Sequence, residues 1–372
     1  MALIDDGLWR EAGPLPRLGD LAAGRANNLN LIRALAATGV LVSHAWPIAL
    51  GPSATEPLHA LTGFSLGALC VMLFFAASGF LIAGSWERRP DPVRFALARA
   101  LRLFPALTVS LVLVALVMGP LVAGRSLLDY AADPEVQSFL FHNLLLVSPQ
   151  YALPGVFEAN PFPHVEGSIW TLLHEALCYG AVLIAGVLGL MTPRRLPALL
   201  GLFAVLWLAL ALWGGVPGRF ARLHELSLPF AMGAAFWCLR DRIALSGWGA
   251  LGLGGLALAA SRVDPEGAGG TLSRLAWSGG LAYGLLWATY VPSGAVRGFN
   301  AFGDYSYGLY IYAFPMQGLM VWWLGAQTPL ANVALSMPLT LGLAILSWHL
   351  VERPALGLLE RRPAMRTRQA SA

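Results

Sequence analysis

Apolar runs long enough to cross a bilayer follow one another along most of the chain, and they constrain its fold more than any other feature. A membrane-spanning helix needs about 20 apolar residues, because each residue rises about 1.5 Å and the hydrocarbon core is about 30 Å thick. The sequence therefore predicts an all-α, polytopic membrane protein with about ten transmembrane helices. The runs are about 31–50, 66–85, 100–123, 168–191, 196–215, 224–240, 243–261, 274–292, 304–324 and 334–351.

The composition excludes a soluble globular protein. Hydrophobic residues make up 57% of the 372 residues and charged residues only 12%, whereas a soluble domain carries about 25% charged residues. The net charge of +4 comes from arginines spread between the apolar runs, which argues against a nucleic-acid partner. Cys70, Cys178 and Cys238 each fall inside an apolar run, so they predict neither a disulfide framework nor a metal site.

The arginines indicate how the chain is threaded through the membrane. All 24 basic residues are arginine, and short cytoplasmic loops carry an excess of such residues. This rule predicts cytoplasmic tails at 1–27 and 358–372, with a membrane domain at 28–357 between them. With the N-terminus inside, nineteen arginines fall on the cytoplasmic side and five on the external side, namely Arg125, Arg219, Arg222, Arg262 and Arg274.

The longest segment outside the predicted spans is about 125–167, on the predicted external face. Its moderately apolar stretch 139–147 is too short to cross the bilayer, so we expect an interfacial or re-entrant piece that lies over the bundle. A long insertion in a protein with so few residues outside the membrane predicts a functional loop.

Arg33 and His44 in the first predicted helix are the clearest candidates for chemistry. They are eleven residues apart, close to three helical turns, so they share one face and lie about 16 Å apart along the axis. His44 lies well inside the membrane, where an ionisable group is costly and usually functional. A structural histidine bonded to a neighbouring helix is the alternative.

Two more motifs place ionisable groups at or in the membrane. Arg99 and Arg102 form an R-x-x-R pair on one helix face; such a pair suits phosphate, although positive-inside anchoring explains most arginine clusters. The segment GSIWTLLHEALCY places Glu175 in the fourth span. His44 is its candidate partner, since a carboxylate would fix the tautomer of the ring and raise its basicity. A structural hydrogen bond between helices is the alternative.

Two weaker patterns are expected to be structural. The segment GDYSYGLYIYAFPMQ contains four tyrosines, which are typical of a membrane interface. The glycines at 252–255 resemble a nucleotide-binding loop only superficially, because within an apolar span they favour close helix packing.

In their order along the chain, these motifs resemble acyltransferase family 3, the bacterial membrane O-acyltransferases that modify sugars. The resemblance covers about 28–357. One departure is that Leu173 and His174 stand where the family usually has Pro or Val before the turn with the glutamate. The similar segments are the R-x10-H of Arg33 and His44, FFAASGFLI at 74–82, the R-x-x-R pair, GSIWTL with Glu175 and Tyr179, DYSYGLYIYAFPMQ, and SWHLVERP at 347–354.

The resemblance implies transfer of an acyl group, expected to be acetyl, across a bacterial inner membrane from cytoplasmic acetyl-CoA. His44 would be the catalytic histidine, Arg33 would support it or the donor, and Glu175 is carried over as the motif acid. Arg99 and Arg102 would bind the acyl-CoA, and no metal is implied. The acceptor would be a hydroxyl of an extracytoplasmic glycan or lipid-linked sugar.

Two other classes of protein compete with this interpretation. A transporter or flippase for a lipid-linked sugar would also need about ten helices and intramembrane charges, but it would often show paired broken helices, and the sequence offers no convincing pair. A membrane scaffold or sensor would not need Arg33, His44 and Glu175 to converge. The sequence leaves open the glycan, the acyl chain, the oligomeric state, and whether His44 is a general base or a covalent acyl carrier.

Overall fold

The computed structural model describes residues 15–24, 26–213, 216–263 and 268–360. Within these ranges every regular element is a helix, and the β-type pairing is a single isolated bridge between Arg17 and Ala244. Residues 1–14 and 361–372 of the two predicted tails lie outside the described residues.

The helices follow one another with short connections, except for the irregular segment before α9. The α-helices are α1 Leu18–Ala22, α2 Leu29–Leu50, α3 Pro57–Thr62, α4 Leu66–Arg88, α5 Pro92–Leu113, α6 Gly119–Ala123, α7 Leu127–Ala131, α8 Pro134–Leu144, α9 Ile169–Val187, α10 Leu196–Leu212, α11 Ala221–Cys238, α12 Gly247–Ala260, α13 Ala268–Tyr290, α14 Ser306–Leu324, α15 Pro329–Ser347 and α16 Arg353–Glu360. The short 3₁₀ and π elements are η2 Val114–Met118, η3 Gly218–Phe220, η4 Gly294–Ala301 and η5 Trp348–Glu352.

Each of the ten predicted spans coincides with a helix or a continuous run of helices. The fold is therefore all-α with several apolar helices, while the count of about ten spans stays a prediction. Leu196–Leu212 and Gly247–Ala260 are apolar but shorter than a span. Five helical runs are long and apolar enough to cross a membrane: Leu29–Leu50, Leu66–Arg88, Pro92–Ala123, Ile169–Val187 and Pro329–Leu359.

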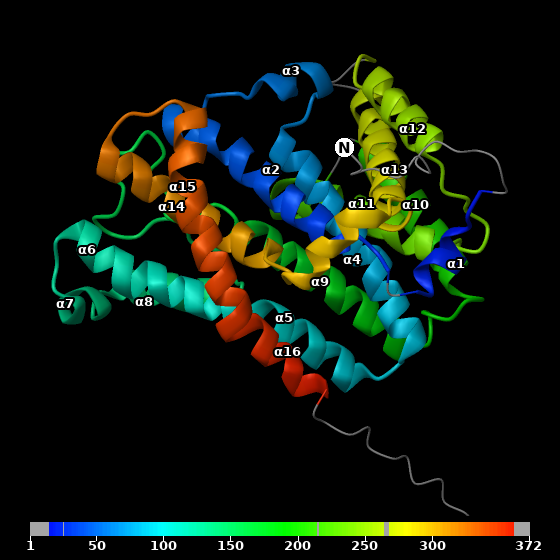
Figure 1. Cartoon of the computed structure of the whole chain (residues 1–372), viewed down its shortest axis with the longest axis horizontal. Helices are drawn as coiled ribbons and strands as arrows, with labels where there is room; N and C mark the ends of the chain where they lie inside the picture. Colours follow the sequence, from blue (N-terminus) through cyan, green and yellow to red (C-terminus); the bar gives the residue numbers. More distant parts are fainter. Residues whose placement is uncertain (1–14, 25, 214–215, 264–267, 361–372) are drawn as a thin grey trace, which may run out of the picture.

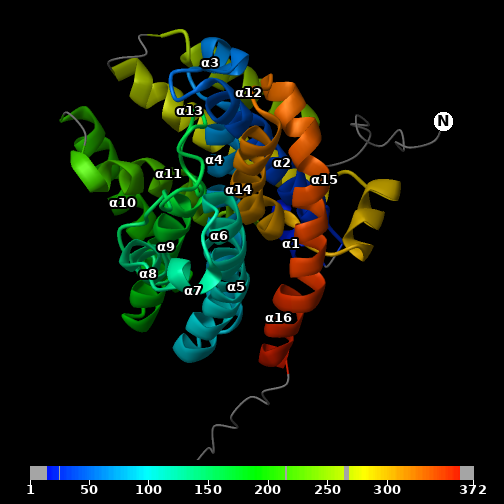
Figure 2. The same ribbon diagram turned by 90° about the vertical axis from the view of Figure 1, so that its left-hand side faces the viewer.

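The helices α2, α4 and α14 form the centre of the bundle. α4 packs against α2, α11 and α13, and α14 packs against α2 and α15. Figure 1 and Figure 2 show α5 and α9 on one side of this centre and α12 and α13 on the opposite side. Side chains of the central helices therefore face the protein interior, where polar groups can be held away from lipid.

Three tyrosines that the sequence suggested for a membrane interface lie in this interior instead. Tyr307, Tyr310 and Tyr312 of α14 are all buried, as are most of their neighbours on the helix. The interface interpretation of these residues is wrong, because α14 is covered on several sides by α2, α5 and α15. Their hydroxyl groups are thus available to the centre of the bundle.

Two glycines let α4 and α11 approach backbone to backbone. A Cβ atom on Gly79 would clash with the carbonyl oxygen of Phe230, and one on Gly233 would clash with that of Ala76. Small residues allow this kind of close crossing between membrane helices, where dispersion rather than the hydrophobic effect drives association. The crossing fixes α11 against the central helix.

The glycines at 252–255 do not have the packing role that the sequence favoured. A Cβ atom on Gly252, Gly254 or Gly255 would meet nothing within 4 Å, so that prediction is wrong. The close approach of α12 to α13 occurs at Gly280, where a Cβ atom would lie 3.2 Å from the carbonyl oxygen of Leu253.

The insertion at 125–167 packs against two helices of the bundle. Val136 and Phe139 are buried on α8, which contacts α5, and the apolar stretch 139–147 ends as a turn after α8. Farther along, the Asn160 side-chain amide donates to the carbonyl oxygen of Gly318 on α14, at 2.9 Å. The insertion therefore contacts the bundle through α5 and α14, while an interfacial or re-entrant position of 139–147 stays a prediction.

The last part of this insertion carries a buried acid. Glu166 is 1% exposed, and its Oε2 atom has no hydrogen-bond partner among the described residues. Burial away from water disfavours the charged form, so it raises the pKa of Glu166 well above its usual range. Burial therefore favours the neutral carboxylic acid of Glu166 over its charged form.

Gly233→Ala should destabilise the protein by about 1–3 kcal/mol, because the added methyl group must push against the rigid backbone of α4. Thermal unfolding of the purified protein in detergent measures the effect. Gly252→Ala is the matched control, since its site is open and alanine is the better helix former. Equal melting temperatures for the two variants would contradict the close crossing of α4 and α11.

Glu166→Gln should weaken the pH dependence of stability. The folded pKa lies above the unfolded value near 4.5, so the stabilisation is complete below that value and is lost as the pH rises through the raised pKa. Unfolding free energies measured across this range should fall less steeply in the variant. Glu158→Gln, which replaces an exposed carboxylate of the same segment, should keep the original slope. An unchanged slope in Glu166→Gln would show that Glu166 is already ionised.

Candidate active site

The carboxylate of Asp304 joins two of the arginines that the sequence singled out. Its Oδ2 atom accepts from Arg33 at 2.9 Å and from Arg102 at 2.7 Å. Arg102 also pairs with Glu352 at 3.4 Å. Because these residues come from α2, α5, the start of α14 and the end of η5, four distant parts of the chain meet at the predicted cytoplasmic end.

Both carboxylates in this cluster are oriented by nearby hydroxyl groups. Ser306 donates to Asp304 at 2.5 Å, and Ser347 donates to Glu352 at 3.0 Å. Sequence reasoning missed both acids, although each stands in a segment quoted for its resemblance, GDYSYG and HLVERP. The signal was available, since an acid at the predicted cytoplasmic mouth needs a cation, and the arginines lie at that mouth.

Arg99 and Arg102 start on the same face of α5 but have different surroundings. Arg99 forms no ion pair among the described residues, and its buried Nε atom lacks a hydrogen-bond partner there. Its guanidinium group instead lies 5.8 Å from the ring centre of Tyr179. Arg102 forms ion pairs with two carboxylates, whereas Arg99 keeps N–H donors available for another group.

Glu175 forms hydrogen bonds with residues other than its predicted partner, His44. It accepts a hydrogen bond from Ser78 of α4 at 2.9 Å, and Tyr179, one turn farther along α9, also donates to it. The predicted pairing of Glu175 with His44 is therefore wrong in this structure. Because Arg99 stacks on Tyr179, Glu175 is connected to the arginine end of the site instead.

His44 lies in α2 beside α14, on the other side of the site. Its buried Nδ1 atom has no hydrogen-bond partner among the described residues, and its ring packs edge-on against Phe314 with centroids 5.3 Å apart. Phe314 in turn contacts Phe162 of the insertion, at 5.9 Å. The ring thus faces the protein interior and keeps a nitrogen available for another group.

Three cavities follow one another through the bundle. The first, of about 350 Å³, is lined by Arg33, Arg99, Arg102 and Glu175, and the last, of about 420 Å³, is lined by His44. A narrow neck of about 50 Å³ lies between them. It shares Arg33, Phe74, Ser78, Glu175 and Tyr307 with the first cavity and Val71 and Tyr310 with the last.

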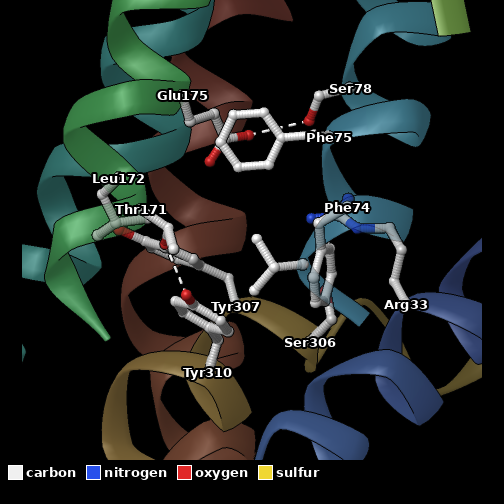
Figure 3. Close-up of a pocket in the computed structure, with 11 residues that line it drawn as sticks. Arg33, Phe74, Phe75, Ser78, Thr171, Leu172, Glu175, Ser306, Tyr307 and Tyr310 are labelled. Carbon is white, nitrogen blue, oxygen red and sulfur yellow. Dashed lines mark hydrogen bonds between the residues drawn. The ribbon is translucent and has the colours of Figure 1, made fainter. Parts of the chain in front are cut away.

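The neck is narrow because aromatic side chains fill much of it. Figure 3 shows Thr171 and Tyr310 joined by a hydrogen bond on one side and Arg33 on the other, with Phe74 between them. Tyr307 is fixed by a hydrogen bond to the backbone of α5, at 2.8 Å. The neck therefore divides an arginine-lined cavity from a histidine-lined cavity while leaving a small space that adjoins both.

The five predicted site residues thus fall into two groups. Arg33, Arg99, Arg102 and Glu175 surround one cavity, and His44 lines the other. The spacing of Arg33 and His44 on one helix places them on either side of the neck. A long anionic molecule can approach from the arginine side and a polar one from the histidine side, so that their reacting groups meet near the neck.

Comparisons with known proteins identify the family of this chain. A family model described as an acyltransferase domain matches residues 27–349. Nodulation protein 10 of Rhizobium leguminosarum bv. viciae is 28% identical over 91% of this chain and 95% of its own length. An O-acetyl transferase of Shigella phage Sf6 is 29% identical over 88% of this chain and 96% of its own length. No solved structure matches. The match over nearly the whole chain shows that this protein belongs to acyltransferase family 3 and is an O-acyltransferase.

Proposed function

We propose that the protein moves an acetyl group from cytoplasmic acetyl-CoA to a sugar hydroxyl on the external side of a bacterial inner membrane. The observation that carries this proposal is the series of cavities that leads from Arg99 through the neck to His44. The Shigella phage relative named as an O-acetyl transferase supports acetyl as the group transferred. The acceptor is a glycan or lipid-linked sugar.

The donor would bind mainly through Arg99. An arginine binds phosphate best when its donors are not already used by carboxylates, and Arg99 is the arginine of this cavity without an ion pair among the described residues. Arg33 and Arg102 instead hold the wall through Asp304. In this proposal Arg102 positions the cavity wall, which departs from the expectation that both arginines of the pair bind the donor.

The pantetheine arm would extend from this cavity into the neck and place the thioester beside the histidine cavity. The rise along α2 from Arg33 to His44, about 16 Å, is a plausible length for that arm. Glu175 and Ser78 border the neck, where they would orient the thioester.

His44 would then act on the transferred group from the other side of the neck. As a general base it takes the proton of the sugar hydroxyl while the hydroxyl oxygen forms a bond to the thioester carbonyl and the thiolate of CoA leaves. As a covalent carrier it first receives the acetyl group itself and then passes it to the sugar. The unpartnered Nδ1 atom is compatible with either role.

A transporter would also need cavities on both sides of a constriction. The family match decides in favour of an enzyme, and the neck of about 50 Å³ fits that choice, because a sugar is too large for it. Group transfer through a closed neck requires neither substrate to cross the membrane.

His44→Ala should lower acetyl transfer by about 100-fold or more, the usual contribution of a positioned acid–base group. Purified protein in nanodiscs is mixed with acetyl-CoA and a glycan extract, and thiol release and glycan acetylation are measured. His59→Ala is the matched control, since it removes an exposed imidazole outside the cavities. A folded His44→Ala protein that acetylates at the full rate would exclude the proposed role.

Arg99→Gln and Arg102→Gln should fail in different ways. Loss of Arg99 should weaken acetyl-CoA binding by about tenfold or more, since a charged hydrogen bond contributes about 1.5–3 kcal/mol, and should change stability little. Loss of Arg102 leaves the buried Glu352 without its ion pair and leaves Asp304 paired with Arg33 alone, and it should destabilise the fold by about 3–5 kcal/mol. Equilibrium binding and thermal unfolding separate the two effects. If Arg99→Gln binds acetyl-CoA with unchanged affinity, Arg99 does not hold the donor.

A further inference from the structure

The histidine-lined cavity contains a second charged cluster that the proposed chemistry does not use. Apart from Tyr310, its ionisable side chains, among the described residues that line it, are His44, Arg222, Glu225 and Arg274. Arg222 and Glu225 lie three residues apart near the start of α11, and Arg274 lies near the start of α13. The cluster therefore sits at the predicted external end, in the same cavity as His44.

Two arginines in this cluster share a single carboxylate. Arg222 contacts Oε2 of Glu225 at 3.2 Å, and Arg274 contacts Oε1 at 3.4 Å. Both distances exceed the 2.7–2.9 Å that is usual for a charge-assisted hydrogen bond. The three side chains together carry one net positive charge, and each guanidinium group has most of its five N–H donors without a partner among the residues that the structure describes.

Both guanidinium groups lie over an aromatic ring. Arg222 lies 5.5 Å from the ring centre of Trp170, and Arg274 lies 5.5 Å from that of Phe64. Stacking occupies the flat faces of an arginine and leaves its N–H edges to form hydrogen bonds. The acid Glu56 is 7% exposed, accepts from the backbone N–H of Leu66 and does not line the cavity.

We propose that the acceptor sugar carries an anionic group, a carboxylate or a phosphate, which binds between Arg222 and Arg274. The anion supplies the charge that Glu225 alone cannot, and it takes the unused donors of both arginines. Binding there holds the sugar in the cavity that His44 lines, so that one of its hydroxyl groups can face the ring. That the molecule carrying this anion is the acceptor rests on the proposed function. The existence of the anion site does not depend on that function.

Binding of three small probes to the purified protein in zwitterionic nanodiscs tests the site without turnover. The probes are methyl α-D-glucopyranoside, which is neutral, methyl α-D-glucuronoside, which carries a carboxylate, and α-D-glucose 1-phosphate. Titration calorimetry should give at least one anionic probe an affinity about tenfold or more above that of the neutral one, with a preference that shrinks as salt is added. Equal affinities, or no binding of any probe at millimolar concentration, would overturn the proposal, and the better anionic probe distinguishes a carboxylate from a phosphate.

Three variants separate an anion site from a merely structural ion pair. Arg222→Gln and Arg274→Gln should each lower the affinity for the preferred anionic probe by about tenfold. Glu225→Gln should raise that affinity, because it removes the competing carboxylate, whereas a neutral-sugar site that uses Glu225 as an acceptor would lose affinity. Arg262→Gln is the matched control, since it removes an exposed arginine of the same predicted face that does not line the cavity.

Acetyl transfer to the same three probes, followed with labelled acetyl-CoA, keeps the two proposals apart. An anionic preference in binding without any transfer would retain the anion site and contradict the proposed function. Transfer that is equally efficient for neutral and anionic probes would retain the function and overturn the anion site.

Discussion

The carboxylate of Asp304 is the interaction on which the arginine side of the site depends. It accepts from Arg33 and Arg102, at 2.9 and 2.7 Å, and so ties α2 and α5 to the start of α14. In a low-dielectric interior an isolated arginine or carboxylate would be very costly, whereas a bridged cluster with serine donors satisfies its members. The three helices are thus held at one end by charge, and their apolar faces determine the rest of the packing.

This bridge also explains why the arginines of the first cavity have different surroundings. Asp304 and Glu352 compensate Arg33 and Arg102, so the wall of the cavity is close to neutral and rigid. Arg99 faces Tyr179 and forms no ion pair with an acid among the described residues. In the proposed function, a donor anion would meet one available guanidinium group in a preorganised surrounding and would not have to break the cluster that holds the helices together.

The sequence predicted the features that depend on one segment at a time. Apolar length placed a helix at each expected span, and helical periodicity placed Arg33 and His44 on one face of α2. The pairing of Glu175 with Tyr179 is an i, i+4 contact within α9, but its pairing with Ser78 depends on how α4 and α9 are rotated against each other, which the spacing of residues within one helix cannot predict. The sequence could likewise suggest that Asp304 and Glu352 need cations, but not which ones, since their partners lie 202 to 271 residues away along the chain.

The dimensions of the neck relate the fold to the chemistry. A cavity needs roughly 10–15 Å³ to hold one water molecule, so a space of about 50 Å³ admits an acetyl group but neither a sugar ring nor a nucleotide. The aromatic residues Phe74, Tyr307 and Tyr310 keep it small, and the hydrogen bonds of the two tyrosines restrict their motion. In the proposed function, keeping bulk water from this point would protect the donor thioester from hydrolysis and strengthen the electrostatic interactions around it. A membrane O-acyltransferase that works in this way would keep the path closed to its substrates while the acetyl group alone passes through the neck.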